Sequence, residues 1–192
     1  TSTILMTSIP RDSYVEEVCD DYACNYGMYD KLTHTGIYGV DTTKDTVENL
    51  LGIDINYVFR VNFTSMIDIV DALGGIDVDV AEGMAVSRFY TNSTLEGVHE
   101  GTNHLDGKRA LAYSRERKAY IDGDVQRARN QQQVLQAMFK KATSPEIITK
   151  YTSLLKALTH AFDTNMSTKE ITSFIKYQIQ AKPSWKFEQY VL

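Results

Sequence analysis

Five of the eight arginines in this chain lie within 21 consecutive residues, and together their side chains could bind an anion. A guanidinium group offers a rigid fork of N–H donors and keeps its charge, so it suits phosphate oxygens. The whole chain is acidic, with a formal net charge of −5. An acidic protein that concentrates its arginines in this way is expected to form a local anion site. The clustered residues are Arg109, Arg115, Arg117, Arg127 and Arg129.

The stretch that begins at Asp124 predicts a helix with polar and apolar side chains on the same side. Asp124, Arg127 and Gln131 fall within about 60° of one another around the helix axis. Burial of an unpaired guanidinium is costly, and arginine cannot lose its proton. Arg127 therefore either pairs locally with Asp124 at i, i+3 or lines a cavity that receives an anion. The apolar residues on this side, which is expected to be buried, are Val134, Leu135, Met138 and Phe139.

Arg115 and Arg117 are predicted to lie in an extended segment, where side chains two positions apart point the same way. Glu116 points to the opposite face, so the two like charges form either a solvated strand edge or an anion clamp. The loop that follows returns the chain to the start of the next helix, where free N–H groups and the helix dipole favour phosphate. Arg11 lies just past a strand end and can join the same point. Such a group of arginines suits a diphosphate better than a single carboxylate.

Alternation and helical periodicity predict the elements that must position these side chains. Strands are expected at 3–9 and 185–192. A strand, a helix and a strand at 53–61, 62–73 and 76–80 are expected to form a βαβ unit, which implies a parallel pairing. The fold class that follows is α/β, a three-layer α-β-α sandwich around a mixed β-sheet.

Further helices are predicted from Thr43 to Leu51 and from about Asp106, and the capping box Ser167-x-x-Glu170 precedes another. Residues 13–35 and 81–103 are predicted to be loops. The chain shows no internal repeat and no low-complexity linker. A single domain over the whole chain is therefore expected.

Length and composition, with 43% hydrophobic residues, fit one ordinary globular domain over residues 1–192. The negative net charge argues against binding to nucleic acid, which needs a basic face. No stretch approaches 18 consecutive apolar residues, and no signal peptide opens the chain. The chain starts without methionine on an apolar run, as a fragment of a longer chain would. Cys19 and Cys24 make a poor zinc site, and a disulfide between them is favoured if the protein lies outside the cytoplasm.

Five stretches, in order, resemble the LytR-CpsA-Psr (LCP) family, and they span nearly the whole chain. The resemblance is greatest to the capsule-associated streptococcal branch. The stretches are SIPRDSYV (8–15), DKLTHTGIYG (30–39), VNFTSMIDIVDALGGIDVDV (61–80), LDGKRALAYSRERK (105–118) and GDVQRARNQQQV (123–134).

The resemblance implies an enzyme of Gram-positive bacteria that is anchored in the cell membrane and acts on its extracellular face. Such enzymes are phosphotransferases. They move a glycopolymer, here expected to be capsular polysaccharide, from an undecaprenyl-pyrophosphate carrier to peptidoglycan. The implied fold is an α-β-α sandwich whose apolar pocket holds the polyprenyl tail. Two alternatives stay open: a non-catalytic polyprenyl-pyrophosphate binder that regulates cell-wall polymer assembly, and a lipid pyrophosphatase.

The resemblance also implies roles for single residues. Asp124, Arg115 and Arg127 are the expected catalytic residues. One arginine of the family's usual RQQ motif is Asn130 here, and whether Arg129 replaces it is left open. The residues matched to pyrophosphate binding are Arg11, Arg115, Arg117, Arg127 and Gln131.

The implied cofactor is Mg²⁺ or Mn²⁺, with Asp124 as one candidate ligand. The family's main metal-binding aspartates lie on strands upstream of SIPRD. The chain is therefore expected to be truncated at its N-terminus, without those strands and the membrane anchor, or to receive that segment from a second chain.

One hypothesis connects the polar and apolar parts of the helix that begins at Asp124. A diphosphate head would meet Arg127 and Gln131, and an isoprenoid tail would run along the apolar side chains that follow. These side chains are equally compatible with an ordinary core. The residues expected to line the lipid pocket are Val134, Leu135 and Met138.

Overall fold

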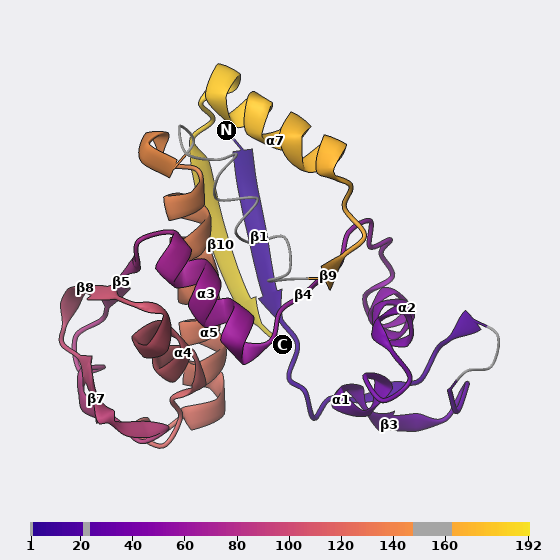
Figure 1. The fold of residues 1–192 in the computed structure, drawn as a ribbon. Coiled ribbons are helices and arrows are strands. Elements are labelled where there is room, and N and C mark those ends of the chain that lie inside the picture. The colour runs from indigo at the N-terminus through magenta and orange to yellow at the C-terminus, as the bar shows by residue number, and fades with distance from the viewer. Residues whose placement is uncertain (1, 21–23, 148–162) are drawn as a thin grey trace. The chain divides into compact units, whose positions relative to one another are not determined.

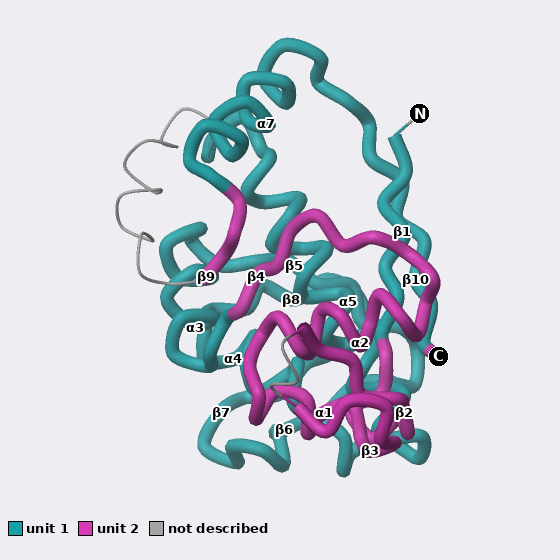
Figure 2. The backbone as a smooth tube through the Cα atoms, turned by 90° about the vertical axis from the view of Figure 1, so that its right-hand side faces the viewer, with its two compact units in different colours: residues 1–8, 61–162, 167–191 teal, residues 9–60, 163–166, 192 magenta. Residues whose placement is uncertain are grey.

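The computed structural model describes residues 2–20, 24–147 and 163–192. The chain forms two compact units, which Figure 2 shows in different colours. Unit 1 comprises residues 1–8, 61–162 and 167–191, and unit 2 comprises residues 9–60, 163–166 and 192.

Unit 1 contains the longest helices and most of the strands (Figure 1). Its strands are β1 (Ser2–Ser8), β5 (Ile76–Val80), β6 (Val86–Phe89), β7 (Asn92–Val98), β8 (Gly101–Leu105) and β10 (Trp185–Val191). Its helices are α3 (Phe63–Ala72), α4 (Gly107–Arg115), α5 (Gly123–Ala142) and α7 (Thr168–Ala181).

Unit 2 is built from shorter elements. These are β2 (Tyr14–Glu16), β3 (Tyr29–Lys31), α1 (Leu32–Thr35), α2 (Val40–Leu51), β4 (Phe59–Arg60) and β9 (Asp163–Thr164). Cys19 and Cys24 form a disulfide, as the sequence predicts. The loop before this disulfide lies against α2, because the backbone of Val18 exchanges two hydrogen bonds with the Thr46 hydroxyl group, at 3.1 and 3.2 Å.

Strands β1 and β10 form a parallel pair in which Ile4 lies opposite Phe187. Helix α5 covers one face of this pair, and the centroid of the Phe139 ring lies 5.6 Å from those of Trp185 and Phe187. The side-chain amide of Gln132 donates hydrogen bonds to both strands. Aromatic contacts and a buried amide therefore fix α5 on this pair.

The acceptors of the Gln132 amide are the Ser8 hydroxyl oxygen, at 2.8 Å, and the Tyr190 carbonyl oxygen, at 2.6 Å. The opposite face of the β1–β10 pair is open within the described residues. Its Leu5 and Tyr190 side chains are 61% and 55% exposed. Helices of unit 1 thus cover one face of the pair.

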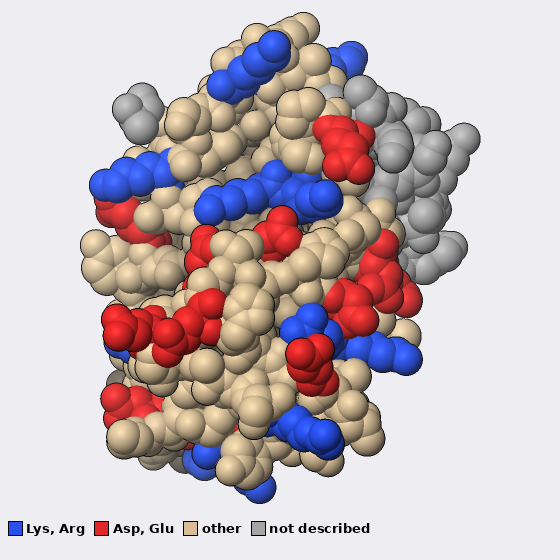
Figure 3. Space-filling view, turned by 90° about the vertical axis from the view of Figure 1, so that its left-hand side faces the viewer, with Lys and Arg blue, Asp and Glu red and all other residues tan. Residues whose placement is uncertain are grey.

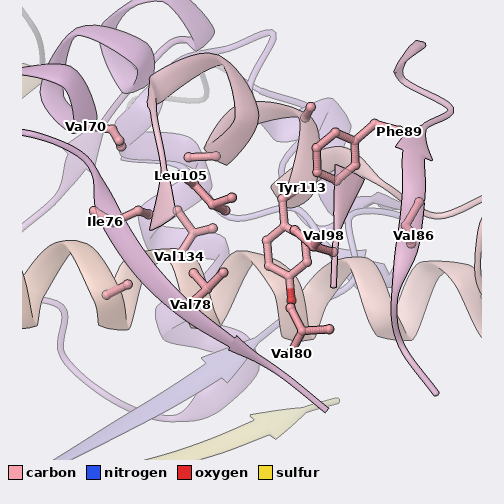
Figure 4. Close-up of a cluster of buried hydrophobic side chains, with 13 residues drawn as sticks. Val70, Ile76, Val78, Val80, Val86, Phe89, Val98, Leu105, Tyr113 and Val134 are labelled. Atoms are coloured by element: carbon pink, nitrogen blue, oxygen red, sulfur yellow. The ribbon is translucent and has the colours of Figure 1, made fainter. Parts of the chain in front are cut away.

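The hydrophobic core of unit 1 brings the β5–β8 and β6–β7 pairs together with α4 and α5 (Figure 4). Buried and exposed residues alternate along the whole of β5, so Ile76, Val78 and Val80 point inward. Val134 of α5 is 1% exposed and belongs to the same cluster. Tyr113 of α4 fills its centre, and the Tyr113 hydroxyl group donates a hydrogen bond to α5.

Helices α3 and α4 start at side-chain caps, as their sequences indicate. Asn62 and Asp106 each accept a hydrogen bond from the N–H group three residues further on, at 2.8 Å. Gly107 allows the two helices to approach closely, because a Cβ at this position would lie 2.4 Å from the Ile67 carbonyl oxygen. Local caps and one small residue therefore set the position of α4, the helix that ends at Arg115.

The α/β class predicted from the sequence is confirmed, and the chain has both parallel and antiparallel pairings. The described strands pair two by two, where one mixed sheet inside a three-layer sandwich was expected. In unit 1, α5 packs against both the β1–β10 pair and β5.

The predicted βαβ unit is wrong. Within 53–61 only β4 is a strand, and it pairs antiparallel with β9, while β5 pairs antiparallel with β8. Several apolar residues of this stretch line a cavity instead, which accounts for their spacing. The loop expected at 81–103 is also wrong, because it contains β6, β7 and most of β8. Their exposed polar residues conceal the strand pattern.

Charged side chains of both signs are interspersed on the face that Figure 3 shows. This mixture agrees with a composition of 20 basic and 25 acidic residues. Among the described helices, none has the length and hydrophobicity that a membrane span requires.

Val134→Ala is expected to lower the free energy of unfolding by about 2 kcal/mol, because deleted buried methyl groups leave a cavity in the core. Leu135→Ala is the matched control on the same helix. Leu135 is 56% exposed, and its truncation is expected to change stability by less than about 0.5 kcal/mol. Urea unfolding measures both variants, and equal losses would contradict this orientation of α5.

Candidate functional site

Helix α4 carries Arg115 to the surface as its last residue. The extended segment predicted for both arginines is therefore wrong at Arg115, and extended backbone begins at Glu116, with a ψ of 131°. The chain then turns, since the Tyr120 N–H group donates to the Arg117 carbonyl oxygen at 3.2 Å. Arg115 and Arg117 thus leave the backbone on either side of Glu116 at the start of a turn.

Glu116 is fully buried between these two exposed arginines. Its Oε1 atom accepts hydrogen bonds from the N–H groups of the next three residues, at 3.0, 3.0 and 3.3 Å. Its Oε2 atom accepts from the N–H groups of Tyr90 and Thr91, at 2.6 and 3.4 Å. Converging N–H dipoles replace the water that a buried carboxylate loses. The prediction placed Glu116 only on the face opposite the two arginines, and neither its burial nor its hydrogen bonds were foreseen.

Asp124 connects two of the predicted anion-binding arginines. Its Oδ1 atom lies 3.0 Å from Nη2 of Arg127 and 3.7 Å from Nη1 of Arg117. The local i, i+3 pair is therefore present, and a second arginine from the preceding turn joins it. Such exposed pairs contribute little to stability, about 0.2–1 kcal/mol each. Arg117, Asp124 and Arg127 are called the arginine cluster below.

Gly123 brings the start of α5 against the turn that carries Arg117. A Cβ at this position would lie 2.4 Å from the Arg117 carbonyl oxygen and 3.3 Å from its Cβ. Only a residue without a side chain allows this approach, which places Asp124 beside Arg117. The requirement was missed because the sequence shows a glycine but not what lies next to it.

Arg115 stacks on an aromatic ring instead of joining the arginine cluster. Its guanidinium carbon lies 4.4 Å from the centroid of the Phe63 ring, at the start of α3. Contacts of this kind are worth about 0.5–1 kcal/mol at exposed sites. Stacking covers one face of the planar guanidinium group, and its N–H donors lie in the plane, where an anion can meet them.

Helix α5 keeps the polar residues of interest on one exposed side. The helical projection placed Asp124, Arg127 and Gln131 on the buried side; the structure corrects this for Asp124 and Gln131, whereas Arg127 is partly buried. The Asp124 side chain is 69% exposed and that of Arg127 is 23% exposed, while Gln131 is exposed. The reason is that α5 is buried on two other sides, one toward the core and one toward β1 and β10. The candidate residues lie on the side between them.

The amides that α5 does bury are Gln126 and Asn130, which sequence reasoning passed over. Gln126 Nε2 donates to Asn130 Oδ1 at 2.9 Å, and Asn130 Nδ2 donates to the Tyr113 carbonyl oxygen at 3.1 Å. Asn130 is fully buried, whereas Arg129 is exposed on another side of the helix. Arg129 therefore does not share the buried environment of position 130, and its role stays open.

The three residues predicted to line a lipid pocket have different environments. Val134 belongs to the core, Met138 is partly buried against that core, and Leu135 is exposed. Their contact with a lipid stays a prediction.

Arg11 belongs to unit 2, away from the arginine cluster in sequence. Its Nε atom donates to Asp12 Oδ2 at 3.4 Å, and Lys31 Nζ donates to Asp12 Oδ1 at 2.9 Å. The hydrogen bond from Lys31 holds the pKa of Asp12 below its usual value, so this carboxylate stays ionised. The expected convergence of Arg11 with the arginines of unit 1 stays a prediction.

Unit 2 contains a cavity of about 440 Å³ beside α2, which sequence reasoning did not find. Its lining is mainly apolar and includes Val47 and Ile55, with Lys44 and Arg60 as its charged members. Hydrogen bonds to Glu48 and Asp45 raise the pKa of Lys44, so it keeps its charge. The volume lies in the range of small-molecule sites, about 300–1,000 Å³.

The predicted magnesium ligand Asp124 does not lie in a metal site formed by the described residues. No group of three or more His, Cys, Asp or Glu side chains arranged for a metal occurs among them. The Oδ1 atom of Asp124 faces the guanidinium groups of Arg117 and Arg127, which are poor neighbours for a cation. The residues in hand therefore do not fit Mg²⁺ or Mn²⁺, and the cofactor stays a prediction.

Together, these observations define an α/β domain in which Arg115, Arg117 and Arg127 lie near the junction of α4 and α5, as a candidate anion site. The chain belongs to the LytR_cpsA_psr family, whose model matches residues 1–189.

Named relatives agree with this assignment. The chain is 37% identical over 168 residues to "Polyisoprenyl-teichoic acid--peptidoglycan teichoic acid transferase TagU" of Bacillus licheniformis, which covers 87% of this chain and 51% of the relative. The solved structure of protein gbs0355 from Streptococcus agalactiae matches 98% of this chain and 63% of its own, with a TM-score of 0.80 and 28% identity. The solved structure of TagT bound to LI-WTA covers 99% of this chain and 66% of the TagT chain, with a TM-score of 0.74 and 32% sequence identity. The chain thus spans about half the length of TagU.

Gly123→Ala is expected to lower the free energy of unfolding by about 1–3 kcal/mol, because the added methyl group collides with the Arg117 carbonyl oxygen. Gly36→Ala is the control, since its Cβ would meet nothing closer than 3.4 Å. The control is expected to stay within about 0.5 kcal/mol of the wild type. Denaturant unfolding compares the two variants, and an unchanged Gly123→Ala variant would contradict the close approach.

Proposed function

We propose that this protein is a phosphotransferase that moves a cell-wall glycopolymer from an undecaprenyl-pyrophosphate carrier to peptidoglycan. The observation that supports this proposal most is the arginine cluster. Arg115 lies close to it in sequence, at the end of α4. Forked, permanently charged donors of this kind suit the adjacent phosphates of a pyrophosphate. The relatives are named as polyisoprenyl-teichoic acid–peptidoglycan teichoic acid transferases, and these names point to the same class of donor.

The proposed step is a displacement at phosphorus. A sugar hydroxyl oxygen of peptidoglycan attacks the phosphate next to the polymer, the bond to the bridging oxygen breaks, and undecaprenyl phosphate leaves with the electron pair. Catalysis of such a step rests on positioning and on neutralising charge in the transition state. We assign the second task to Arg115, Arg117 and Arg127, with Gln131 as a further hydrogen-bonding group.

The proton of the attacking hydroxyl needs an acceptor, and Asp124 is the candidate in unit 1. Its side chain is mostly exposed, so a bound hydroxyl can reach it. Its carboxylate oxygens can accept the proton of an attacking hydroxyl group. We therefore assign Asp124 the role of base, and Arg11 a pyrophosphate contact from unit 2.

The lipid part of the donor requires an apolar site. The cavity in unit 2 offers one, because Val47, Ile55 and their neighbours form a mainly apolar lining. We propose that this cavity binds isoprenoid hydrocarbon, and the contacts of Val134, Leu135 and Met138 in unit 1 with a lipid stay predictions. Bound hydrocarbon would gain about 25 cal/mol for each Å² of apolar surface that it buries.

The finer assignments rest on the sequence. We propose capsular polysaccharide as the polymer and the extracellular face of the cell membrane as the location, because the resemblance is greatest to the capsule-associated branch. The relatives are named as transferases of teichoic acid instead. Labelled lipid-linked donors of both kinds decide between the two polymers.

Arg127→Ala and Arg115→Ala are each expected to lower the transfer rate about 10- to 150-fold, because each removes a charge-assisted contact worth about 1.5–3 kcal/mol. Arg115 is exposed and Arg127 is partly exposed, so the melting temperature should stay within a few degrees. Arg88→Ala, at an exposed position in β6, is the matched control. Full transfer activity in both variants would exclude these arginines from the site.

The reaction class is tested with labelled undecaprenyl-pyrophosphate-linked polymer, with and without peptidoglycan. Label on the glycan supports the transferase. Release of the lipid without acceptor would show a pyrophosphatase, and retention of intact donor would show a non-catalytic binder. Either of the last two results would overturn the proposed function.

Val47→Trp is expected to weaken binding of a polyprenyl phosphate at least tenfold, because the larger side chain fills the cavity that we assign to the lipid. Leu50→Trp on the same helix is the control, since Leu50 is exposed and does not line the cavity. Fluorescence titration in detergent measures both. Equal affinities of the two variants would place the lipid elsewhere.

A further inference from the structure

The buried carboxylate of Glu116 lies at the centre of the backbone that carries the arginines. Its hydrogen bonds reach two separate turns, one after α4 and one between β6 and β7. The second turn is also tied to α4, because the Thr91 hydroxyl group donates to the Ala112 carbonyl oxygen at 3.2 Å. A single side chain thus fixes the backbone on which Arg115 and Arg117 are mounted.

We propose that Glu116 is a positioning residue of the anion site: it fixes the directions in which Arg115 and Arg117 present their guanidinium groups. The hydrogen bonds of Glu116 show that it holds the backbone of both turns. That the held arginines bind an anion rests on the proposed function. Glu116 is fully buried, so it does not touch the anion itself.

Charge explains why this position needs a carboxylate. All five hydrogen bonds at the side chain come from N–H donors, so both oxygens must accept. A glutamine would turn an NH₂ group toward one set of donors and lose those bonds. The negative charge also offsets the repulsion between two arginines that are separated by one residue.

Gly123 shows that the turn is confined from the other side. The start of α5 touches the Arg117 carbonyl oxygen so closely that a Cβ does not fit. The turn is therefore held from inside by Glu116 and from outside by α5. Because Arg117 also pairs with Asp124, a displaced turn would open the arginine cluster.

The test measures affinity for inorganic pyrophosphate by titration calorimetry at low and high salt. Glu116→Gln is expected to weaken binding at least tenfold and to reduce its salt dependence, because a displaced guanidinium group no longer contributes its charge. In the transfer assay its KM for the donor should rise more than its kcat falls. Glu116→Asp keeps the charge and is expected to recover part of the affinity.

Asn103→Ala is the matched control for lost stability. Asn103 is also a buried polar residue of unit 1 that holds a turn, with three hydrogen bonds to the backbone of His99 and Gly101, at 2.7–3.0 Å. Its loss should lower the melting temperature as Glu116→Gln does, yet leave pyrophosphate affinity within twofold of the wild type.

Three results would overturn the positioning role. They are wild-type affinity in Glu116→Gln, an equal loss of affinity in Asn103→Ala, or, where Glu116→Gln does not fold, wild-type affinity in Glu116→Asp. A wild-type protein that fails to bind pyrophosphate would instead count against the proposed function. The two failures are therefore distinguishable.

Discussion

Helix α5 packs on two sides at once, against the β1–β10 pair through Phe139 and Gln132 and against the core of unit 1 through Val134. A helix held in this way cannot rotate about its axis without losing aromatic contacts on one side or core packing on the other. Its remaining exposed side is therefore fixed, and that side carries Asp124 and Arg127. Close packing of α5, more than any contact of the arginines themselves, determines which side of the helix faces the candidate site.

The arginine cluster is an arrangement of like charges that needs compensation. The Asp124 carboxylate supplies negative charge at the surface, and the buried Glu116 carboxylate supplies it beneath the turn that carries Arg117. The ion pairs of Asp124 are exposed, so they are weak and exchangeable. The bonds of Glu116 are buried, so their loss leaves unsatisfied N–H groups and is costly. This difference suits an anion site, because an incoming phosphate can compete with Asp124 while the backbone stays fixed.

The chemistry that we propose is distributed over both units. Unit 1 contains the arginine cluster and the stacked Arg115, whereas unit 2 contains Arg11 and the mainly apolar cavity. Each site by itself has the chemistry of one part of the proposed donor: the arginines suit its charged head, and the mainly apolar cavity suits its hydrocarbon tail.

The sequence alone determined the α/β class, the alternation of β5, the start of α4 near Asp106, the capping box of α7 and the family, and it favoured the disulfide for a protein outside the cytoplasm. These features depend on local spacing and on short motifs, which the chain itself displays. Tertiary structure decided the rest. The projection of α5 grouped Asp124 with Gln131 correctly but predicted that both are buried, because burial depends on which other elements pack against a helix. The stretch 53–61 shows the same limit, since its apolar residues mostly line a cavity where a strand was expected. Glu116 and Gly123 gave no signal, because their importance lies in contacts with backbone that neither spacing nor residue type reveals.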